Sequence, residues 1–215
     1  MTSIPLRPRG PSRRLPRGAV LKLLPPPPSS SKDVAWWAMA LLCATEGAFF
    51  AYLIMSYFYL GLRSPTWPPP GLGQPDLKLP LIMTATLLAS SAAVWWGEHG
   101  IERGRRGQLV AGLVTGIALG LSFLGMQYRE YHEKLRHFLP QTHAYASIFY
   151  TTTGFHGAHV AFGVLMLAFT LARALLGHFD AGEHTAVKTT SLYWHFVDAV
   201  WLAIILSIYV SPRFY

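Results

Sequence analysis

Five long apolar runs restrict the fold of this chain more than any other feature. A helix needs about 20 apolar residues to cross a hydrocarbon layer about 30 Å thick, and each run approaches or exceeds that length. Of all residues, 52% are apolar and only 13% are charged, which excludes an ordinary soluble domain. We therefore predict an all-α integral membrane protein with one membrane domain, 34–211, and spans at about 34–62, 80–97, 108–127, 144–176 and 189–210.

The first 33 residues have a different composition. They carry seven Arg or Lys residues and four consecutive prolines, Pro25 to Pro28. Such a segment cannot build a core and favours extended, disordered chain. We expect residues 1–33 to form a cytoplasmic tail, for which contact with anionic lipid is one role. A mitochondrial transit peptide is the alternative for a segment that is rich in arginine and free of acidic residues.

The basic residues also predict the orientation of the helices. Twelve of the 18 Lys and Arg residues lie in the tail and in the segments 98–107 and 173–188, which five spans place on one side of the membrane. Only six lie on the other side. Because basic loops are retained in the cytoplasm, the N-terminus is predicted to be inside. The formal charge of +8 then reflects membrane orientation, and we expect no nucleic acid as a partner.

Ionisable side chains inside the predicted spans are the candidate functional residues. Glu46 lies about 18 Å along the first span at 1.5 Å per residue, near mid-membrane. Burying an ionisable side chain in lipid costs free energy, so such a residue usually has a function. The alternative for Glu46 is a structural role, as a neutral carboxyl group buried against a neighbouring helix. Each such side chain needs a partner in a medium without water, so we expect a polar network and a pair between Glu46 and a histidine. The other members are His156, His159, His195 and Asp198.

A metal site is the competing interpretation of these residues, and the composition argues against it. A haem needs facing histidines around a wide cavity, whereas the neighbouring glycines predict tight packing. A di-iron bundle needs about four carboxylates. Outside the spans, Glu130, His132 and Glu133 form a further candidate metal group, for which a solvated charged segment is the alternative.

Two other features are interpreted as packing. Gly112, Gly116 and Gly120 have four-residue spacing, which lets another helix approach closely in lipid. The single cysteine, Cys43, lies in an apolar run, where a small buried residue is the simpler interpretation than a nucleophile or half of a disulfide.

Five segments resemble successive helices of subunit III of haem–copper oxidases of the cytochrome c oxidase type. The resemblance covers about residues 35–211, and its most specific parts are TGFHGxHV and YWHFVDxVW. The five-span layout is similar to the bacterial form of the family. The segments are CATEGAFF, PLIMTATLLASS, FLGMQYREY, ASIFYTTTGFHGAHV and SLYWHFVDAVWLAIILSIY.

The resemblance implies an accessory subunit with no redox centre of its own. Haem and copper would belong to the catalytic subunit I, and subunit II and phospholipids would be further partners. Subunit III of this family holds lipid in a V-shaped cleft and supports proton uptake. Glu46 matches the family's proton-related intramembrane glutamate, and Arg173 and His178 match its lipid-headgroup ligands. The remaining signature positions, His156, His159, His195 and Asp198, would link helices as a polar network.

Several alternatives remain open at this stage. The chain would be a non-catalytic subunit of an oxidoreductase complex of the cytochrome c oxidase type, and the sequence does not indicate whether cytochrome c or quinol is the electron donor of that complex. A subunit of a quinol oxidase, or the related protein that accompanies some nitric oxide reductases, is one alternative. A stand-alone membrane metalloenzyme and a proton-conducting protein centred on Glu46 are two more. We expect a bacterial plasma membrane as the location, with the mitochondrial inner membrane as the alternative.

Overall fold

The computed structural model describes residues 30–69, 76–136 and 139–214, and shows a bundle of five long helices. The helices run through Ser30–Arg63 (α2), Lys78–Glu102 (α3), Arg106–Lys134 (α4), Ala144–Leu175 (α5) and Thr185–Ile204 (α6). A six-residue π-helical segment, Ile205–Val210 (η1), and a short 3-10 turn, Ser211–Arg213 (η2), continue α6 without a break. The prediction of an all-α chain with five long apolar helices is confirmed.

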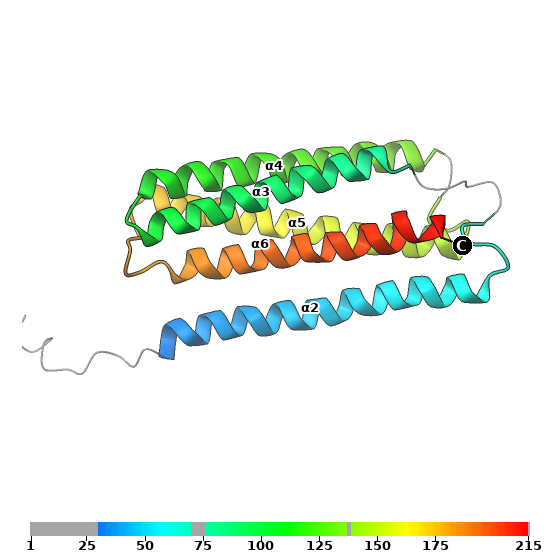
Figure 1. Ribbon diagram of the computed structural model, residues 1–215, viewed down its shortest axis with the longest axis horizontal. Helices are drawn as coiled ribbons and strands as arrows, with labels where there is room; N and C mark the ends of the chain where they lie inside the picture. Colours follow the sequence, from blue (N-terminus) through cyan, green and yellow to red (C-terminus); the bar gives the residue numbers. More distant parts are fainter. Residues whose placement is uncertain (1–29, 70–75, 137–138, 215) are drawn as a thin grey trace, which may run out of the picture.

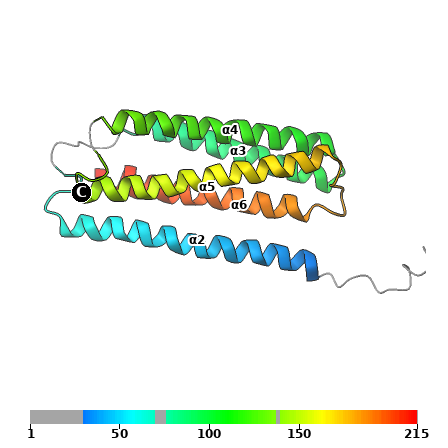
Figure 2. The same ribbon diagram turned by 180° about the vertical axis from the view of Figure 1, so that it is seen from behind.

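Successive helices are antiparallel, so each connecting segment lies at one end of the bundle (Figure 1). In Figure 1, α6 lies between α3 above it and α2 below it, while Figure 2 shows α4 and α5 from the other side. The helix α2 packs against α5 and α6. The closest pair in the bundle is α3 and α4, the two helices that are joined by the shortest turn.

Two tryptophans of α6 anchor this helix in the core. Trp194 and Trp201 are fully buried, with 0% and 1% of their surface exposed. The indole N–H of Trp194 donates to the Ser90 hydroxyl at 3.0 Å, and that of Trp201 donates to the Thr84 hydroxyl at 2.9 Å. Both acceptors belong to α3. A buried indole N–H needs such a partner, so the two bonds fix α6 against α3.

The glycine stripe of α4 acts as a packing surface, as its spacing predicts. A Cβ at Gly112 would lie 2.5 Å from the carbonyl oxygen of Ala93 and 2.8 Å from the Cα of Gly97, both in α3. At Gly116 it would meet Val94, and at Gly120 it would meet Trp194. Backbone therefore touches backbone between α3 and α4, which is the close approach that small residues permit in membranes.

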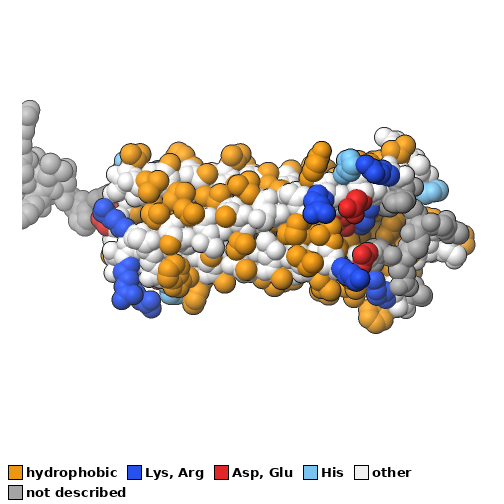
Figure 3. All heavy atoms as spheres, turned by 90° about the horizontal axis from the view of Figure 1, so that it is seen from above, with side chains coloured by type: hydrophobic (Ala, Val, Ile, Leu, Met, Phe, Trp, Pro, Cys, Tyr) orange, Lys and Arg blue, Asp and Glu red, His pale blue; other side chains and the backbone are white. Residues whose placement is uncertain are grey.

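The surface agrees with a membrane protein. Five helices are long and apolar enough to cross a membrane: Val34–Arg63, Lys78–Glu102, Arg106–Lys134, Ala144–Leu175 and Thr185–Arg213. In Figure 3, hydrophobic side chains cover the middle of the visible face, and charged side chains gather at its two ends. A soluble protein does not expose apolar surface on this scale. The apolar band is the part that lipid or protein partners must cover.

The helices extend beyond the apolar runs of the sequence. The second span was expected to end near Gly97, but α3 continues to Glu102. The third was expected to end near Gln127, but α4 continues to Lys134 and includes Glu130 and His132. The helix α2 begins at Ser30, inside the expected tail, and residues 1–29 lie outside the described part of the chain.

Candidate functional site

Glu46 of α2 and His159 of α5 form a pair across the helix interface. The Nε2 atom of His159 lies 3.1 Å from Oε2 of Glu46. The ring of Phe50 packs on the His159 ring at a centroid distance of 5.0 Å, and the Tyr193 hydroxyl of α6 donates to the carbonyl of His159. Three helices therefore hold this pair. The expected partnership between Glu46 and a histidine is present, and His159 is the histidine.

The hydrogen bond between Glu46 and His159 requires one proton that the two side chains share. The Nδ1 atom of His159 lies 2.7 Å from the backbone carbonyl of Phe155. A carbonyl only accepts, so Nδ1 carries the hydrogen. In a neutral ring, Nε2 is then an acceptor, and the Glu46 carboxyl must supply the proton of their bond; in the charged ring, Nε2 donates. In both forms the pair holds one shared proton.

His156 occupies a different environment, although it lies only one turn from His159. Its side chain is fully buried, and neither ring nitrogen has a hydrogen-bond partner in the described structure. The ring stacks on Trp201 at 5.0 Å and meets the edge of Phe123 at 5.7 Å. It is held by aromatic packing between α4, α5 and α6, rather than by the polar network that we expected from the sequence.

His195 and Asp198 lie on the α3 side of α6. The Nδ1 atom of His195 lies 3.1 Å from the Ser91 hydroxyl, which is the bond that joins α6 to α3 here. Asp198 is buried near the same Ser91 hydroxyl, but neither of its carboxyl oxygens makes a well-formed hydrogen bond within the described residues. Sequence reasoning did not identify Ser91, because a serine in an apolar run carries no signal without its tertiary contact.

The four signature residues therefore divide into three separate environments. His159 contacts Glu46, His156 lies within an aromatic core, and His195 contacts Ser91 with Asp198 beside it. No hydrogen bond joins one of the four to another in the part of the chain that the structure describes. His159 and His195 each link two helices by a side-chain hydrogen bond, and among the described residues no single network runs through all four.

Arg173 and His178 lie together at the end of α5, as their proximity in sequence suggests. Both line a cavity of about 410 Å³ that α2, α5 and α6 share. The Arg173 guanidinium lies over the ring of Phe179 at 4.9 Å, which fixes its position. The other lining residues are Ala35, Phe179, Glu183, Thr185, Ala186 and Thr189.

Two further cavities follow the same side of the bundle toward mid-membrane. One of about 360 Å³ is lined by α5 and α6 residues, including Phe162 and Thr190. Another of about 310 Å³ is lined by Leu42, Glu46, Ala158, His159, Phe162 and Tyr193. Phe162 lines both, so they adjoin. The Glu46–His159 pair thus opens onto an apolar, grooved surface that begins near Arg173.

Glu130, one of the candidate metal ligands, has structural partners. Its Oε1 atom lies 2.8 Å from Nζ of Lys134 and accepts a hydrogen bond from the Tyr209 hydroxyl at 3.1 Å. The Lys134 ammonium also lies over the Phe149 and Tyr209 rings, at 4.2 and 4.9 Å. His132 and Glu133 are exposed. No three His, Cys, Asp or Glu side chains in the described ranges lie close enough to hold a metal ion.

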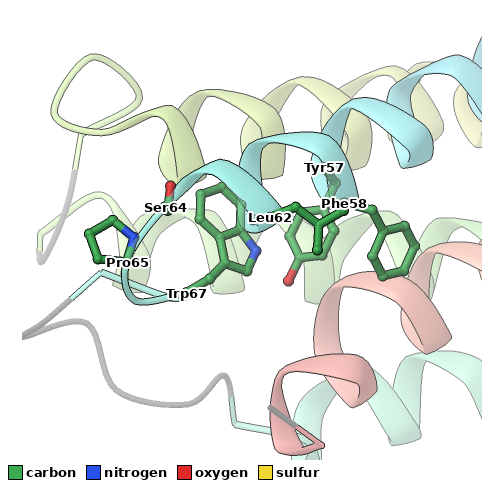
Figure 4. A pocket seen from close by; sticks show the side chains of 7 residues that line it. Tyr57, Phe58, Leu62, Ser64, Pro65 and Trp67 are labelled. Carbon is green, nitrogen blue, oxygen red and sulfur yellow. The ribbon is translucent and has the colours of Figure 1, made fainter.

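A smaller cavity of about 220 Å³ lies at the far end of α2 (Figure 4). Trp67 packs beside Gly61, where a Cβ would lie 3.2 Å from the indole ring. The Tyr57 and Tyr145 rings lie 5.4 and 5.1 Å from Trp67. This aromatic cluster seats the segment that follows α2 on the end of the bundle. The sequence gave no indication of this cluster.

These features define a multi-pass all-α membrane protein with polar side chains midway along its helices and at one end of a grooved surface. The family model of cytochrome c oxidase subunit III matches residues 31–212. Curated relatives named cytochrome c oxidase subunit 3 are 38% identical in Tachyglossus aculeatus aculeatus and 39% identical in Danio rerio, each over 180 residues. Each alignment covers 80% of this chain and 68% of the relative.

The chain belongs to the cytochrome c oxidase subunit III family, a family of respiratory oxidase subunits. The matched segment covers α3 to α6 and all of α2 except Ser30, and it includes every residue of the Glu46–His159 pair, the Ser91–His195 contact and the Arg173 cavity. Family membership implies that other oxidase subunits are its partners. The resemblance that the TGFHGxHV and YWHFVDxVW motifs indicated is confirmed.

Proposed function

We propose that this chain is the accessory subunit III of a haem–copper oxidase that passes electrons from cytochrome c to oxygen, with haem and copper in the catalytic subunit I. The observation that supports this role most directly is the family match over residues 31–212. The chain itself would carry no redox centre. The resemblance to the five-span bacterial form favours the plasma membrane of a bacterium, with the N-terminus in the cytoplasm.

The first experiment is purification of the tagged chain from its native membrane in mild detergent. We expect haem-bearing and copper-bearing subunits to co-purify, and an optical spectrum with haem bands that belong to those subunits. The identity of the partners separates a cytochrome c oxidase from a quinol oxidase and from a nitric oxide reductase assembly. A lone chain that purifies with stoichiometric haem or iron contradicts the proposal.

We further propose that the groove between α2 and α5 holds phospholipid. Arg173 and His178 at its end supply charge for a phosphate headgroup, and the apolar cavities beyond them have room for acyl chains. A guanidinium is suited to this because it binds two phosphate oxygens at once. The groove would then be the lipid cleft that the family resemblance implies.

Arg173→Ala tests this role of the groove. We expect the purified complex to lose bound phospholipid, measured by lipid phosphorus and mass spectrometry. Arg103→Ala is the matched control, because Arg103 lies at the same end of the bundle but on an exposed turn away from the cavity. Equal lipid content in the parent and both variants would show that Arg173 holds no lipid.

We also propose that Glu46 supports proton uptake, with His159 holding its proton in position. The pair carries one shared proton, and the Glu46 side chain is 34% exposed, so this chain alone does not enclose the carboxyl group. Glu46→Gln is the variant that best distinguishes a role in proton transfer from a role in the contact with His159. The glutamine amide can donate to Nε2 of His159 and so keep the contact, but it cannot release a proton.

For Glu46→Gln we expect an assembled complex with slower proton uptake or fewer turnovers before it inactivates. Both are measured on the purified oxidase in vesicles. Glu133→Gln is the control, since Glu133 is exposed at the end of α4 and outside the groove. If Glu46→Gln matches the parent in proton uptake and in lifetime, the glutamate has only a structural role.

A further inference from the structure

The contact between Glu46 and His159 depends on the proton that the two side chains share. The Nδ1 atom of His159 lies 2.7 Å from the Phe155 carbonyl oxygen, and Nε2 lies 3.1 Å from the Glu46 carboxyl group. When the shared proton leaves, the neutral ring has one hydrogen for these two acceptors. One ring nitrogen must then face an acceptor with its own lone pair, which is repulsive. The structure therefore cannot keep both contacts after the pair loses its proton.

The contact with Glu46 is the one that opens. The Phe155 contact is the shorter of the two and lies within one turn of α5, so a repulsion there is relieved only by distorting that helix. The Phe50 ring packs on the imidazole at a centroid distance of 5.0 Å and hinders its rotation. The hydrogen of the neutral ring therefore stays on Nδ1, and Nε2 faces the Glu46 carboxylate across the interface between α5 and α2.

The helix α2 lies along one edge of the bundle (Figure 1). In its most apolar stretch, 17% of the residues are buried, against 33% to 50% in the other four spans. Among the described residues 34–56, Glu46 is the one whose side chain hydrogen-bonds to another helix. Cavities of about 410 and 310 Å³ lie between this part of α2 and the helices α5 and α6. The N-terminal half of α2 is therefore held loosely.

No permanent positive charge in the described part of the chain replaces the shared proton. Three titratable side chains act electrostatically on the pair: Cys43 of α2, His156 of α5 and Tyr193 of α6. None of these is a lysine or an arginine, and none of the ion pairs among the described residues joins Glu46 to one. A bare carboxylate is therefore better solvated away from His159, on the side where the Glu46 side chain is already exposed.

We propose that the proton shared by Glu46 and His159 holds α2 on the bundle, and that its release to water at the grooved surface frees the N-terminal half of α2 from α5 and α6. This inference rests on the proposed function, because it requires Glu46 to lose a proton. The other end of α2 stays in place, since Tyr57 packs against Trp67 at 5.4 Å (Figure 4) and against Tyr145 at 6.1 Å. The helix turns about this aromatic cluster, and the two cavities beside it widen.

Distances between two spin labels in the purified complex test this movement. One label replaces Leu41 of α2 and the other replaces Leu175 of α5, and both side chains are 68% exposed. The control pair joins Leu175 to Val114 of α4, which is also exposed, and does not involve α2. All labelled chains carry Cys43→Ala. As the pH rises and the pair loses its proton, we expect the mean Leu41–Leu175 distance to increase by about 2 Å, the size of known helix shifts. The control distance should stay constant.

Two substitutions of Glu46 distinguish the effect of the shared proton from other effects of pH. Glu46→Gln keeps a donor to Nε2 of His159 at every pH, so the distance should stay short. Glu46→Ala makes no bond at any pH, so we expect the longer distance throughout. Infrared difference spectra of the parent against Glu46→Gln identify the bands of the carboxyl group and the imidazole ring. These bands give the pH at which the pair loses its proton.

Two outcomes overturn the inference and leave the proton role of Glu46 intact. The parent distance could stay constant while the infrared bands report loss of the proton, or Glu46→Ala could show the short distance of the parent. Infrared bands that do not change over the whole pH range in which the complex stays assembled have a different meaning. The pair then keeps its proton, so the proposed proton role of Glu46 fails, and the inference fails with it.

Discussion

At the scale of single residues, two glycines of α4 allow the effect of helix packing on stability to be distinguished from the effect of helix propensity. A Cβ at Gly112 would lie 2.5 Å from the Ala93 carbonyl oxygen, a backbone atom that cannot rotate away, whereas a Cβ at Gly125 meets nothing within 4 Å. We expect Gly112→Ala to lower the free energy of unfolding by about 1–3 kcal/mol, the cost of overpacking a close contact.

Gly125→Ala makes the same chemical change in the same helix and should be neutral or stabilising by about 1 kcal/mol, because alanine is the better helix former. Thermal unfolding of both variants in detergent, followed by circular dichroism, measures the difference. Equal midpoints for the two variants would show that α3 and α4 do not depend on the contact at Gly112.

The buried hydrogen bond of Trp194 allows a second test at this scale. Ser90→Ala removes the acceptor and leaves the indole N–H buried without a partner, which costs about 1–3 kcal/mol. Ser122→Ala is the control, because the exposed Ser122 hydroxyl bonds only to the Ala118 carbonyl of its own helix. The same unfolding measurement should show a loss for Ser90→Ala alone.

At the scale of helices, the apolar runs predict which elements exist but not where they end. The length of an apolar run matches the thickness of the hydrocarbon layer, whereas the backbone hydrogen bonds determine the residue at which a helix ends. The helix α3 continues past Glu98 because α4 packs along it as far as the tight turn at Gly104. Gly104 has a φ of 72°, a backbone conformation that suits glycine. The extension of α4 is stabilised by the contacts of Glu130 and Lys134, which no local pattern indicates.

Most residues of the candidate site could be predicted from the sequence, but their contacts could not. Glu46, His159 and His195 were identified because ionisable groups in apolar runs are conspicuous, and Arg173 was identified through the family resemblance. The separation of His156 from His159 was not, because a three-residue spacing leaves the two side chains pointing about 60° apart around a helix. That angle sends one ring into the aromatic core and the other toward α2. Partners such as Ser91 become visible only when α3 and α6 pack.

The Lys134 cluster offers a prediction for the end of α4. The Glu130 and Lys134 side chains are 5% and 20% exposed, so their ion pair is largely buried. We expect Lys134→Met to destabilise the bundle by about 3 kcal/mol, because the Glu130 carboxylate loses its compensating charge. The double variant Glu130→Gln with Lys134→Met should recover most of this loss, since it buries no charge. A double variant that is less stable than Lys134→Met would contradict this account of the cluster.

At the scale of the whole molecule, the orientation in the membrane decides which end of the groove faces the cytoplasm. The Arg173 cavity and the turn 103–105 lie at the same end of the antiparallel bundle as the start of α2, and the turn before α5 lies at the opposite end. The excess of basic residues predicts that the first of these ends is inside. Two single cysteines test this in intact cells, in a background with the buried Cys43 changed to alanine.

In that background, Thr142→Cys and Arg103→Cys place one thiol at each end of the bundle, and both positions are exposed. We expect a membrane-impermeant maleimide to label Thr142→Cys in intact cells, and to label Arg103→Cys only after the membrane is opened. Labelling of both thiols in opened membranes is the control for reactivity. The reverse pattern would place Arg173 and His178 on the outer side, and the phospholipid that we propose for the groove would then come from the outer leaflet.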